Sequence, residues 1–87
     1  MTYSIEFAKE AESDFTILVR SDRRLAERVV AKIESLGAHP TEGKPLAGNH
    51  KGEFSLRVGS YRVVYELDAA RRIVYVLTIK HRKHVYR

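Results

Sequence analysis

Three runs of β-branched and aromatic residues, joined by very short connections, constrain the fold of this chain more than any other feature. The runs span residues 53–58, 61–67 and 72–80, and only residues 59–60 and 68–71 separate them. Valine, isoleucine, tyrosine and phenylalanine are typical of strands, and tight connections join antiparallel neighbours. The second half of the chain therefore predicts a three-stranded antiparallel meander.

The residues before the meander predict one strand and two helices. Apolar residues alternate with polar ones over residues 3–7, which is the pattern of a half-buried strand. From residue 9 the apolar spacing becomes helical. We expect a first helix to about residue 20, and then a second that is capped by Ser21 or Asp22 and ended by Gly37. The apolar stripes of these helices are Ala11, Phe15, Leu18 and Val19 in the first, and Leu25, Val29, Ile33 and Leu36 in the second.

This order of elements predicts a single α+β domain over residues 1–87. An N-terminal strand, a two-helix hairpin and a three-stranded meander can pack as two layers, with the hairpin covering one face of the sheet. The chain has no cysteine and is 44% hydrophobic, so a packed core rather than disulfide bonds must hold it together. Residues 39–52 contain both prolines and three glycines, and we expect them to form a long loop.

The chain lacks the patterns of a membrane or secreted protein. Its longest strongly apolar run, residues 73–79, is far shorter than the roughly 20 residues that a membrane span requires. Its amino terminus has no signal-peptide pattern. We therefore expect a cytoplasmic protein without a membrane partner.

The positive charge of the chain is confined to its second half. Residues 1–43 contain six Lys or Arg and eight Asp or Glu. Residues 44–87 contain ten Lys or Arg and only three Asp or Glu, which gives that half a net charge of +7. No acidic residue follows Asp68. This distribution favours a polyanionic partner, although a basic surface that only keeps the protein soluble has the same composition.

The predicted strands bring cationic and aromatic side chains together. Alternation along residues 53–58 puts Glu53, Ser55 and Arg57 on the face that meets solvent or a ligand. Guanidinium groups suit phosphate oxygens, and aromatic rings offer faces on which a base can stack. The residues that combine these properties are Arg57, Arg62, Arg82, Lys83, Tyr61 and Tyr86. They predict a surface for a nucleic-acid backbone, unless Tyr61 and Tyr65 are core or edge residues and the arginines are only solvated.

Other kinds of site lack their sequence signatures. The glycines match neither a phosphate-binding loop nor a dinucleotide motif, which argues against a nucleotide-dependent enzyme. His81 and His84 have the spacing of metal ligands, but no carboxylate follows Asp68 to complete a site. No Ser, His and Asp set lies in the strand-turn-helix context of a covalent hydrolase. We therefore expect no metal and no cofactor.

Short motifs follow one another along the chain in a specific order. They are LAGN at residues 46–49, LRVGSYRVVY at residues 56–65, KHRKHVY at residues 80–86, and the Arg-x-x-x-Tyr spacing within the last of these. Together with the predicted strand and helical hairpin, they resemble the RelE/ParE superfamily of bacterial and archaeal toxins over nearly the whole chain. The resemblance implies a RelE-like fold and a toxin that a cognate antitoxin restrains.

The resemblance further implies a metal-independent endoribonuclease that cuts messenger RNA, usually on the ribosome. In such enzymes the ribose 2′-hydroxyl attacks the adjacent phosphate, expels the 5′-oxygen and leaves a cyclic phosphate. By motif position, Arg62 resembles the arginine that binds the scissile phosphate, Arg82 the arginine at the leaving group, and Tyr86 the tyrosine that contacts a base. The residues then expected to contact the RNA backbone are Arg57, Lys80, Lys83 and Lys44.

The general base is the catalytic role that the motifs do not assign. Some relatives carry two lysines on the strand before the Tyr-Arg motif, whereas this chain has Glu53 and Ser55 there. Lys51, just before that strand, could lower the barrier electrostatically, and His81 is the other candidate, because the reference pKa of a histidine, about 6.5, suits proton transfer. Each also has a simpler role, Lys51 as a backbone contact and His81 as part of the carboxy-terminal turn.

Two other functions fit parts of the sequence. A ParE-like poison of DNA gyrase shares the fold and needs no RNA-cutting site, so the joint presence of Arg62, Arg82 and Tyr86 favours the ribonuclease. A basic module that binds without cutting fits the charge but leaves the motifs unexplained. For the ribonuclease we expect three partners: messenger RNA, the ribosome, and an antitoxin that lies across the basic sheet face or along the helices.

Overall fold

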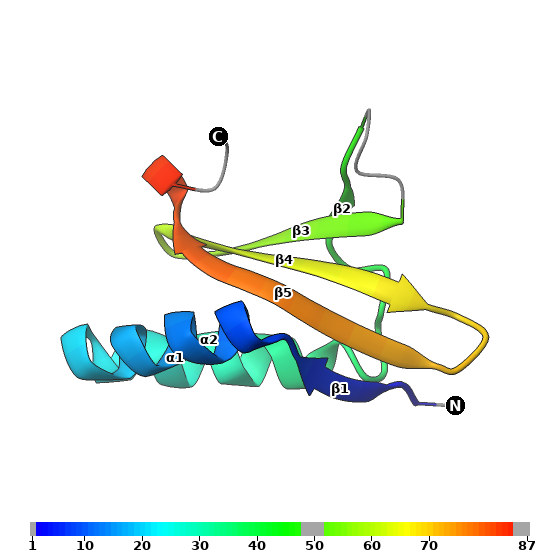
Figure 1. The fold of residues 1–87 in the computed structure, drawn as a ribbon, viewed down its shortest axis with the longest axis horizontal. Helices are drawn as coiled ribbons and strands as arrows, with labels where there is room; N and C mark the ends of the chain where they lie inside the picture. The colour runs from blue at the N-terminus through cyan, green and yellow to red at the C-terminus, as the bar shows by residue number, and fades with distance from the viewer. Residues whose placement is uncertain (1, 48–51, 85–87) are drawn as a thin grey trace.

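Five strands form one sheet in the order β1-β5-β4-β3-β2, and two helices cover one of its faces (Figure 1). This computed structural model describes residues 2–47 and 52–84. The elements are β1 (Ser4–Phe7), α1 (Lys9–Ser21), α2 (Arg23–Ser35), β2 (Lys44–Pro45), β3 (Glu53–Val58), β4 (Tyr61–Asp68), β5 (Ile73–His81) and the single 3-10 turn η1 (Arg82–His84). The predicted α+β class, with its helical hairpin and meander, is confirmed.

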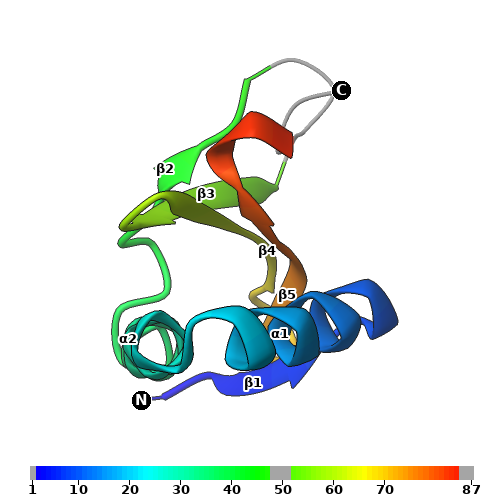
Figure 2. The same cartoon turned by 90° about the vertical axis from the view of Figure 1, so that its left-hand side faces the viewer.

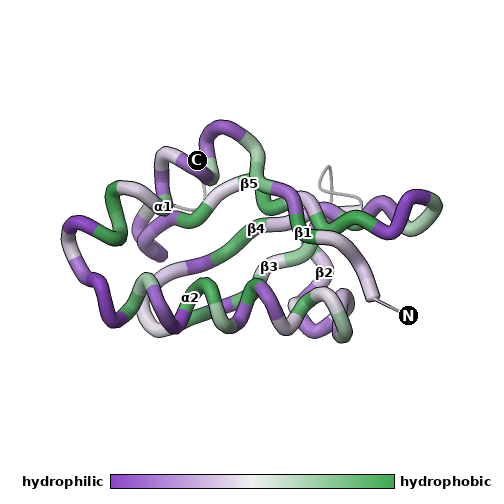
Figure 3. The backbone as a smooth tube through the Cα atoms, turned by 90° about the horizontal axis from the view of Figure 1, so that it is seen from below, coloured by the Kyte–Doolittle hydropathy of each residue, from purple (hydrophilic) through white to green (hydrophobic). Residues whose placement is uncertain are grey.

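The molecule has two layers, one of helices and one of strands. Seen from the side, α1 and α2 lie on the same face of the sheet, α1 against β5 and α2 against β3 (Figure 2). From the helical side, green apolar segments alternate with purple polar ones along both helices, as expected for helices with one buried face (Figure 3). The opposite face, here called the outer face, carries no helical element except η1 among those described. No helix in the described part of the chain is long and apolar enough to cross a membrane.

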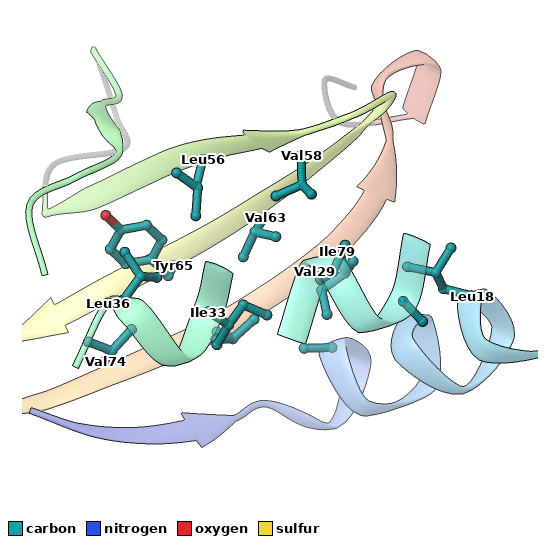
Figure 4. Packing of buried hydrophobic residues seen from close by; sticks show 13 residues of the cluster. Leu18, Val29, Ile33, Leu36, Leu56, Val58, Val63, Tyr65, Val74 and Ile79 are labelled. Atoms are coloured by element: carbon teal, nitrogen blue, oxygen red, sulfur yellow. The ribbon is translucent and has the colours of Figure 1, made fainter. Parts of the chain in front are cut away.

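Apolar stripes of both helices pack onto the inward residues of β3, β4 and β5 to form the core (Figure 4). In α2, Val29 and Ile33 recur at helical spacing and are at most 1% exposed. Fully burying such a side chain contributes roughly 1.5–3 kcal/mol. The predicted stripes are confirmed, with Phe15, Val19 and Leu25 at the partly buried margin of the core.

The amino-terminal strand pairs with the last strand of the meander. β1 runs parallel to β5, from Ser4 opposite Ile73 to Phe7 opposite Val76. The sequence predicts β1 without its partner, because alternation indicates a half-buried strand but not its neighbour. The pairing makes β5 an interior strand, between β1 and β4.

A β-bulge in β5 changes which of its side chains face the core. Val64 pairs with Thr78 and the next residue, Tyr65, pairs with Val76, so Leu77 has no opposite residue on β4. Simple alternation cannot continue through such a point. The side-chain pattern of β5 therefore changes phase within the strand.

α2 ends near the predicted residue, but for a different reason. The helix stops at Ser35, and Leu36 keeps a right-handed conformation with φ −66°. Gly37 is not a left-handed cap: its carbonyl accepts the Tyr3 N–H at 2.7 Å. A Cβ on Gly37 would lie 3.1 Å from the Tyr3 carbonyl oxygen. The glycine therefore lets α2 end directly against the amino-terminal strand.

A carboxylate on α1 completes the edge of β5 beyond the end of β1. Asp14 is 9% exposed, and its Oδ2 accepts the Ile79 backbone N–H at 2.9 Å. Its Oδ1 binds the Lys80 ammonium at 2.8 Å, and Glu10 binds the same ammonium at 3.0 Å. The hydrogen bond to Asp14, followed by that to Glu10, raises the pKa of Lys80 above its ordinary value.

Removing the Asp14 carboxylate is expected to destabilise the fold. Asp14→Ala leaves the Ile79 N–H and the Lys80 ammonium without this partner, and we expect the free energy of unfolding to fall by about 2–3 kcal/mol. Asp14→Asn is the matched control, because its amide oxygen can still accept the N–H and only the ion pair is lost. Chemical denaturation measures both variants. Equal losses would show that the contact to Ile79 contributes nothing.

The ion pair also predicts how stability depends on alkaline pH. Because folding raises the pKa of Lys80, its contribution is complete below the pKa of an unfolded lysine, about 10.4, and is lost as the pH rises through the raised value. Wild-type stability should therefore fall more steeply than that of Asp14→Asn above about pH 10. Parallel stability profiles across this range would contradict the assignment.

Candidate functional site

A row of cations crosses the outer face of the sheet. Arg62 on β4 lies directly opposite Arg57 on β3 and Lys80 on β5, and directly opposed residues of antiparallel strands project from the same face. Like charges directly opposite each other destabilise a sheet. An anion bound between Arg57 and Arg62 would relieve their repulsion, whereas Lys80 is paired with carboxylates of α1.

Arg62 is oriented by the neighbouring strand. Its Nη1 donates to the Ser55 Oγ at 3.0 Å, and Ser55 is 4% exposed. Ser55 lies on the predicted face of β3 but is not open to solvent, because β2, a strand that the sequence does not predict, pairs with β3 and places Lys44 opposite Ser55. A guanidinium has five N–H donors, so this contact leaves others for an anion.

A groove on the outer face gathers three of the predicted cations. Its volume is about 280 Å³. It is lined by Glu42, Gly43, Lys44, Ser55, Leu56, Arg57 and Arg62. We call it the Arg62 groove. With three cations and one carboxylate, it suits an anionic ligand.

One buried phenol holds the wall of the Arg62 groove. Tyr65 is fully buried, and its hydroxyl donates to the Pro40 carbonyl at 2.8 Å and accepts the Gly43 N–H at 2.9 Å. Burial raises the pKa of this phenol, which the Gly43 hydrogen bond partly offsets. A Cβ on Gly43 would lie 2.8 Å from the Tyr65 hydroxyl, so only glycine fits. The expected loop over residues 39–52 thus contains a short strand, β2, which delivers Lys44 to the sheet.

The chain beyond β5 folds back to the β3–β4 turn. The Arg82 N–H donates to the Ser60 carbonyl at 2.8 Å, two residues before Arg62 in the sequence. η1 lies at this end of the sheet, on the side away from the helices (Figure 1). Arg82 and Lys83 are exposed there. The hydrogen bond therefore brings the two predicted catalytic arginines to the same end of the outer face.

His81 contacts both the sheet and the carboxy-terminal turn. Its ring meets the Tyr61 ring edge to face, with centroids 5.5 Å apart. Its Nδ1 accepts the Lys83 N–H at 3.3 Å, and this requires an unprotonated Nδ1. The simpler of the two roles considered for His81, that of holding the turn, therefore has a physical basis.

Lys80, a predicted contact to the RNA backbone, does not line the Arg62 groove. Lys80 shares the register row, but its ammonium is bound by Glu10 and Asp14 of α1. Lys51 and Tyr86 lie outside the described residues. Within residues 2–47 and 52–84, no three His, Asp or Glu side chains gather as metal ligands do.

Known proteins resemble this chain in sequence and in fold. The family model for the ParE toxin of the type II toxin-antitoxin system parDE matches residues 5–86. Toxin RelG of Mycobacterium tuberculosis is 35% identical over 88 residues, which cover all of this chain and 99% of RelG. The toxin-antitoxin complex RelBE2 of the same organism contains a chain that is 31% identical, with a TM-score of 0.83 over 93% of this chain and 99% of that one. An archaeal RelE-RelB complex from Pyrococcus horikoshii, at 22% identity, shares the fold, with a TM-score of 0.79 over 98% of this chain and 100% of that one.

Tyr65→Phe is expected to loosen the groove wall. The change removes one hydroxyl and leaves the Pro40 carbonyl and the Gly43 N–H without this partner, which should lower the free energy of unfolding by about 1–3 kcal/mol. Amide hydrogen exchange at Gly43, Lys44 and Leu46 should become faster. Tyr75→Phe is the matched control, since the half-buried Tyr75 has no hydrogen bond to any described residue through its hydroxyl. Equal effects of the two variants would contradict the role of the phenol.

Proposed function

We propose that this chain, which belongs to the RelE/ParE superfamily of toxins from type II toxin-antitoxin systems, cleaves messenger RNA at the Arg62 groove. The observation that carries the proposal is the Arg62 guanidinium, oriented by Ser55 within a groove that also holds Arg57 and Lys44. Donors fixed before the substrate binds are what charge stabilisation at a phosphate requires.

The proposed reaction is a transesterification within the RNA. A base takes the proton of the ribose 2′-hydroxyl, the oxygen attacks the adjacent phosphorus, and the bond to the 5′-oxygen breaks. That oxygen takes up a proton, and a 2′,3′-cyclic phosphate remains. Negative charge increases on the phosphate oxygens as the new bond forms, and Arg62 is proposed to stabilise it.

Arg82 is proposed to stabilise the leaving oxygen. A guanidinium, with a pKa above about 12, keeps its proton and acts better as a charge than as an acid. Arg82 is exposed on η1, and its backbone is bound to Ser60 at the end of the sheet where Arg62 lies. Tyr86, outside the described residues, stays the proposed contact to a base.

Lys51 and His81 stay the two candidates for the general base. The Nδ1 of His81 already accepts the Lys83 N–H, so its Nε2 would have to exchange the proton with the substrate. Lys51 lies outside the described residues, and its proposed role is electrostatic. The reaction as proposed needs no metal and no cofactor.

The proposed partners are a cognate antitoxin and messenger RNA on the ribosome, in the cytoplasm. RelBE2 and the archaeal RelE-RelB are themselves toxin-antitoxin complexes. For an antitoxin this chain offers the cationic outer face, which suits an acidic segment, and an apolar groove of about 560 Å³ between β1, α1 and α2. Residues such as Ile5, Phe7 and Phe15 line the second groove, which suits an amphipathic helix.

A gyrase poison is the second candidate function, because the matching family model is that of the ParE toxin. Such a toxin acts on a complex of protein and DNA and does not need the arginine groove. A supercoiling assay with purified protein separates the two functions. Inhibition of gyrase without any RNA cleavage would replace the ribonuclease proposal.

Cleavage is expected to depend on the two arginines. Arg62→Ala should lower the cleavage rate by about 10²–10³-fold, the usual effect of losing a preorganised donor, and Arg82→Ala should also lower it. Arg71→Ala is the matched control, because it removes the same charge from the β4–β5 turn at the other end of β4. Cleavage of messenger RNA with and without ribosomes measures the rates. Wild-type cleavage by both Arg62→Ala and Arg82→Ala would disprove the site.

Ser55 is expected to act as a positioning residue for Arg62. Ser55→Ala removes the hydroxyl that accepts from the guanidinium. A hydrogen bond to a charged group contributes roughly 1.5–3 kcal/mol, and we expect part of this free energy to be lost from the stabilisation of the transition state. We expect kcat to fall by roughly tenfold while KM changes little. A loss of stability with kcat unchanged would show that Ser55 serves the fold alone.

A further inference from the structure

A second groove lies beside the Arg62 groove, between α2 and the β3–β4 turn. Its volume is about 480 Å³. It is lined by Arg28, Ala31, Lys32, Ser35, Glu42, Arg57, Val58 and Gly59. We call it the Arg28 groove. It shares Arg57 and Glu42 with the Arg62 groove, so the two are neighbours along one surface.

Two cations of α2, Arg28 and Lys32, line this groove, and Arg24 precedes them on the same side of the helix. Arg24, Arg28 and Lys32 recur every four residues, and so lie on one side of α2 about 6 Å apart along its axis. Like charges at this spacing destabilise a helix by roughly 0.2–0.5 kcal/mol per pair. The arrangement therefore points to an external anion.

Arg28 and Arg57 approach the β3–β4 turn together. Gly59 has φ +59° and no side chain, and a Cβ on it would lie 4.0 Å from Arg28 Nη1. Arg57 Nε donates to the Gly59 carbonyl at 3.4 Å. No hydrogen bond or ion pair joins Arg28 to any other described residue. Its guanidinium donors are therefore available over the turn.

Glu42 is the only carboxylate in the lining of the two grooves. Its carboxylate binds the Lys32 ammonium at 3.2 Å and accepts from the Ser35 hydroxyl at 3.5 Å. Both partners of this ion pair are substantially exposed, so it adds little stability. Its charge would oppose an anion in either groove. Across the two grooves, five cations face this single carboxylate.

We propose that the Arg28 groove binds the backbone of the same RNA strand that is cut in the Arg62 groove, through phosphates beyond the scissile one. This inference rests on the proposed ribonuclease function. An RNA strand is favoured over an acidic peptide because the lining offers guanidinium forks and only small apolar side chains, Ala31 and Val58. The shared Arg57 makes the path from one groove to the other continuous.

Binding of non-cleavable RNA tests the inference. The probes are a trinucleotide and a dodecamer with a 2′-deoxy sugar at the scissile position. Arg28→Ala should weaken binding of the dodecamer and leave binding of the trinucleotide nearly unchanged. The slope of log affinity against log salt concentration for the dodecamer should also become shallower, by about 0.7 for each lost phosphate contact. Glu42→Gln should strengthen binding of the dodecamer. Arg71→Ala, at the far turn, controls for a simple change of net charge.

The outcomes separate this inference from the proposed function. Equal binding of the dodecamer by wild type and Arg28→Ala overturns the inference, even if Arg62→Ala abolishes cleavage and so supports the ribonuclease. A loss of affinity for the antitoxin alone also overturns it, because the groove would then hold a peptide. If Arg62→Ala cleaves RNA normally but Arg28→Ala still weakens binding of the dodecamer, the Arg28 groove binds RNA and the proposed catalytic site in the Arg62 groove is wrong. Thermal unfolding of each variant confirms that it is folded.

Discussion

The outer surface of this protein depends on a hydroxyl group that the core holds. Tyr65 is fully buried, yet its oxygen joins the backbone at Pro40 and Gly43, and these residues lead into the short strand that covers Ser55. A buried polar group must be satisfied, so the connection cannot move without a cost in free energy. The packing of the core under the sheet and the position of Lys44 on the outer face therefore depend on the same side chain, Tyr65.

Electrostatic repulsion is concentrated where β3, β4 and α2 lie near one another. Arg57 and Arg62 oppose each other across β3 and β4, and a second line of cations runs along α2 beside them. At the other end of the register row, Lys80 is neutralised by carboxylates of α1. Carboxylates therefore pair with Lys80 and Lys32, whereas Arg57 and Arg28 have no carboxylate partner among the described residues. A polyanion is the kind of partner that such a surface stabilises on binding.

Patterns in the sequence predict the elements that depend on local periodicity, and they miss those that depend on tertiary contacts. The meander, both helices and the short turn at residues 59–60 follow from spacing alone. β2 does not, because Lys44–Pro45 has no periodicity and exists only by pairing with β3. The sequence predicts the face of β3 on which Ser55 lies but not its burial, because that burial depends on the pairing of β2 with β3. Asp14 lies on an apolar stripe, and only the unpaired edge of β5 explains a carboxylate there.

The parallel pairing of β1 with β5 sets the order in which the protein can be completed during synthesis. The first strand leaves the ribosome early, but its partner begins at Ile73, so the sheet cannot close until almost all the described residues have been translated. Contacts so distant in sequence form slowly, since the intervening chain must first be ordered. A nascent chain therefore carries its helices and its arginines for some time before they are assembled into one surface. Toxicity, if it requires that surface, is delayed by the topology of the sheet itself.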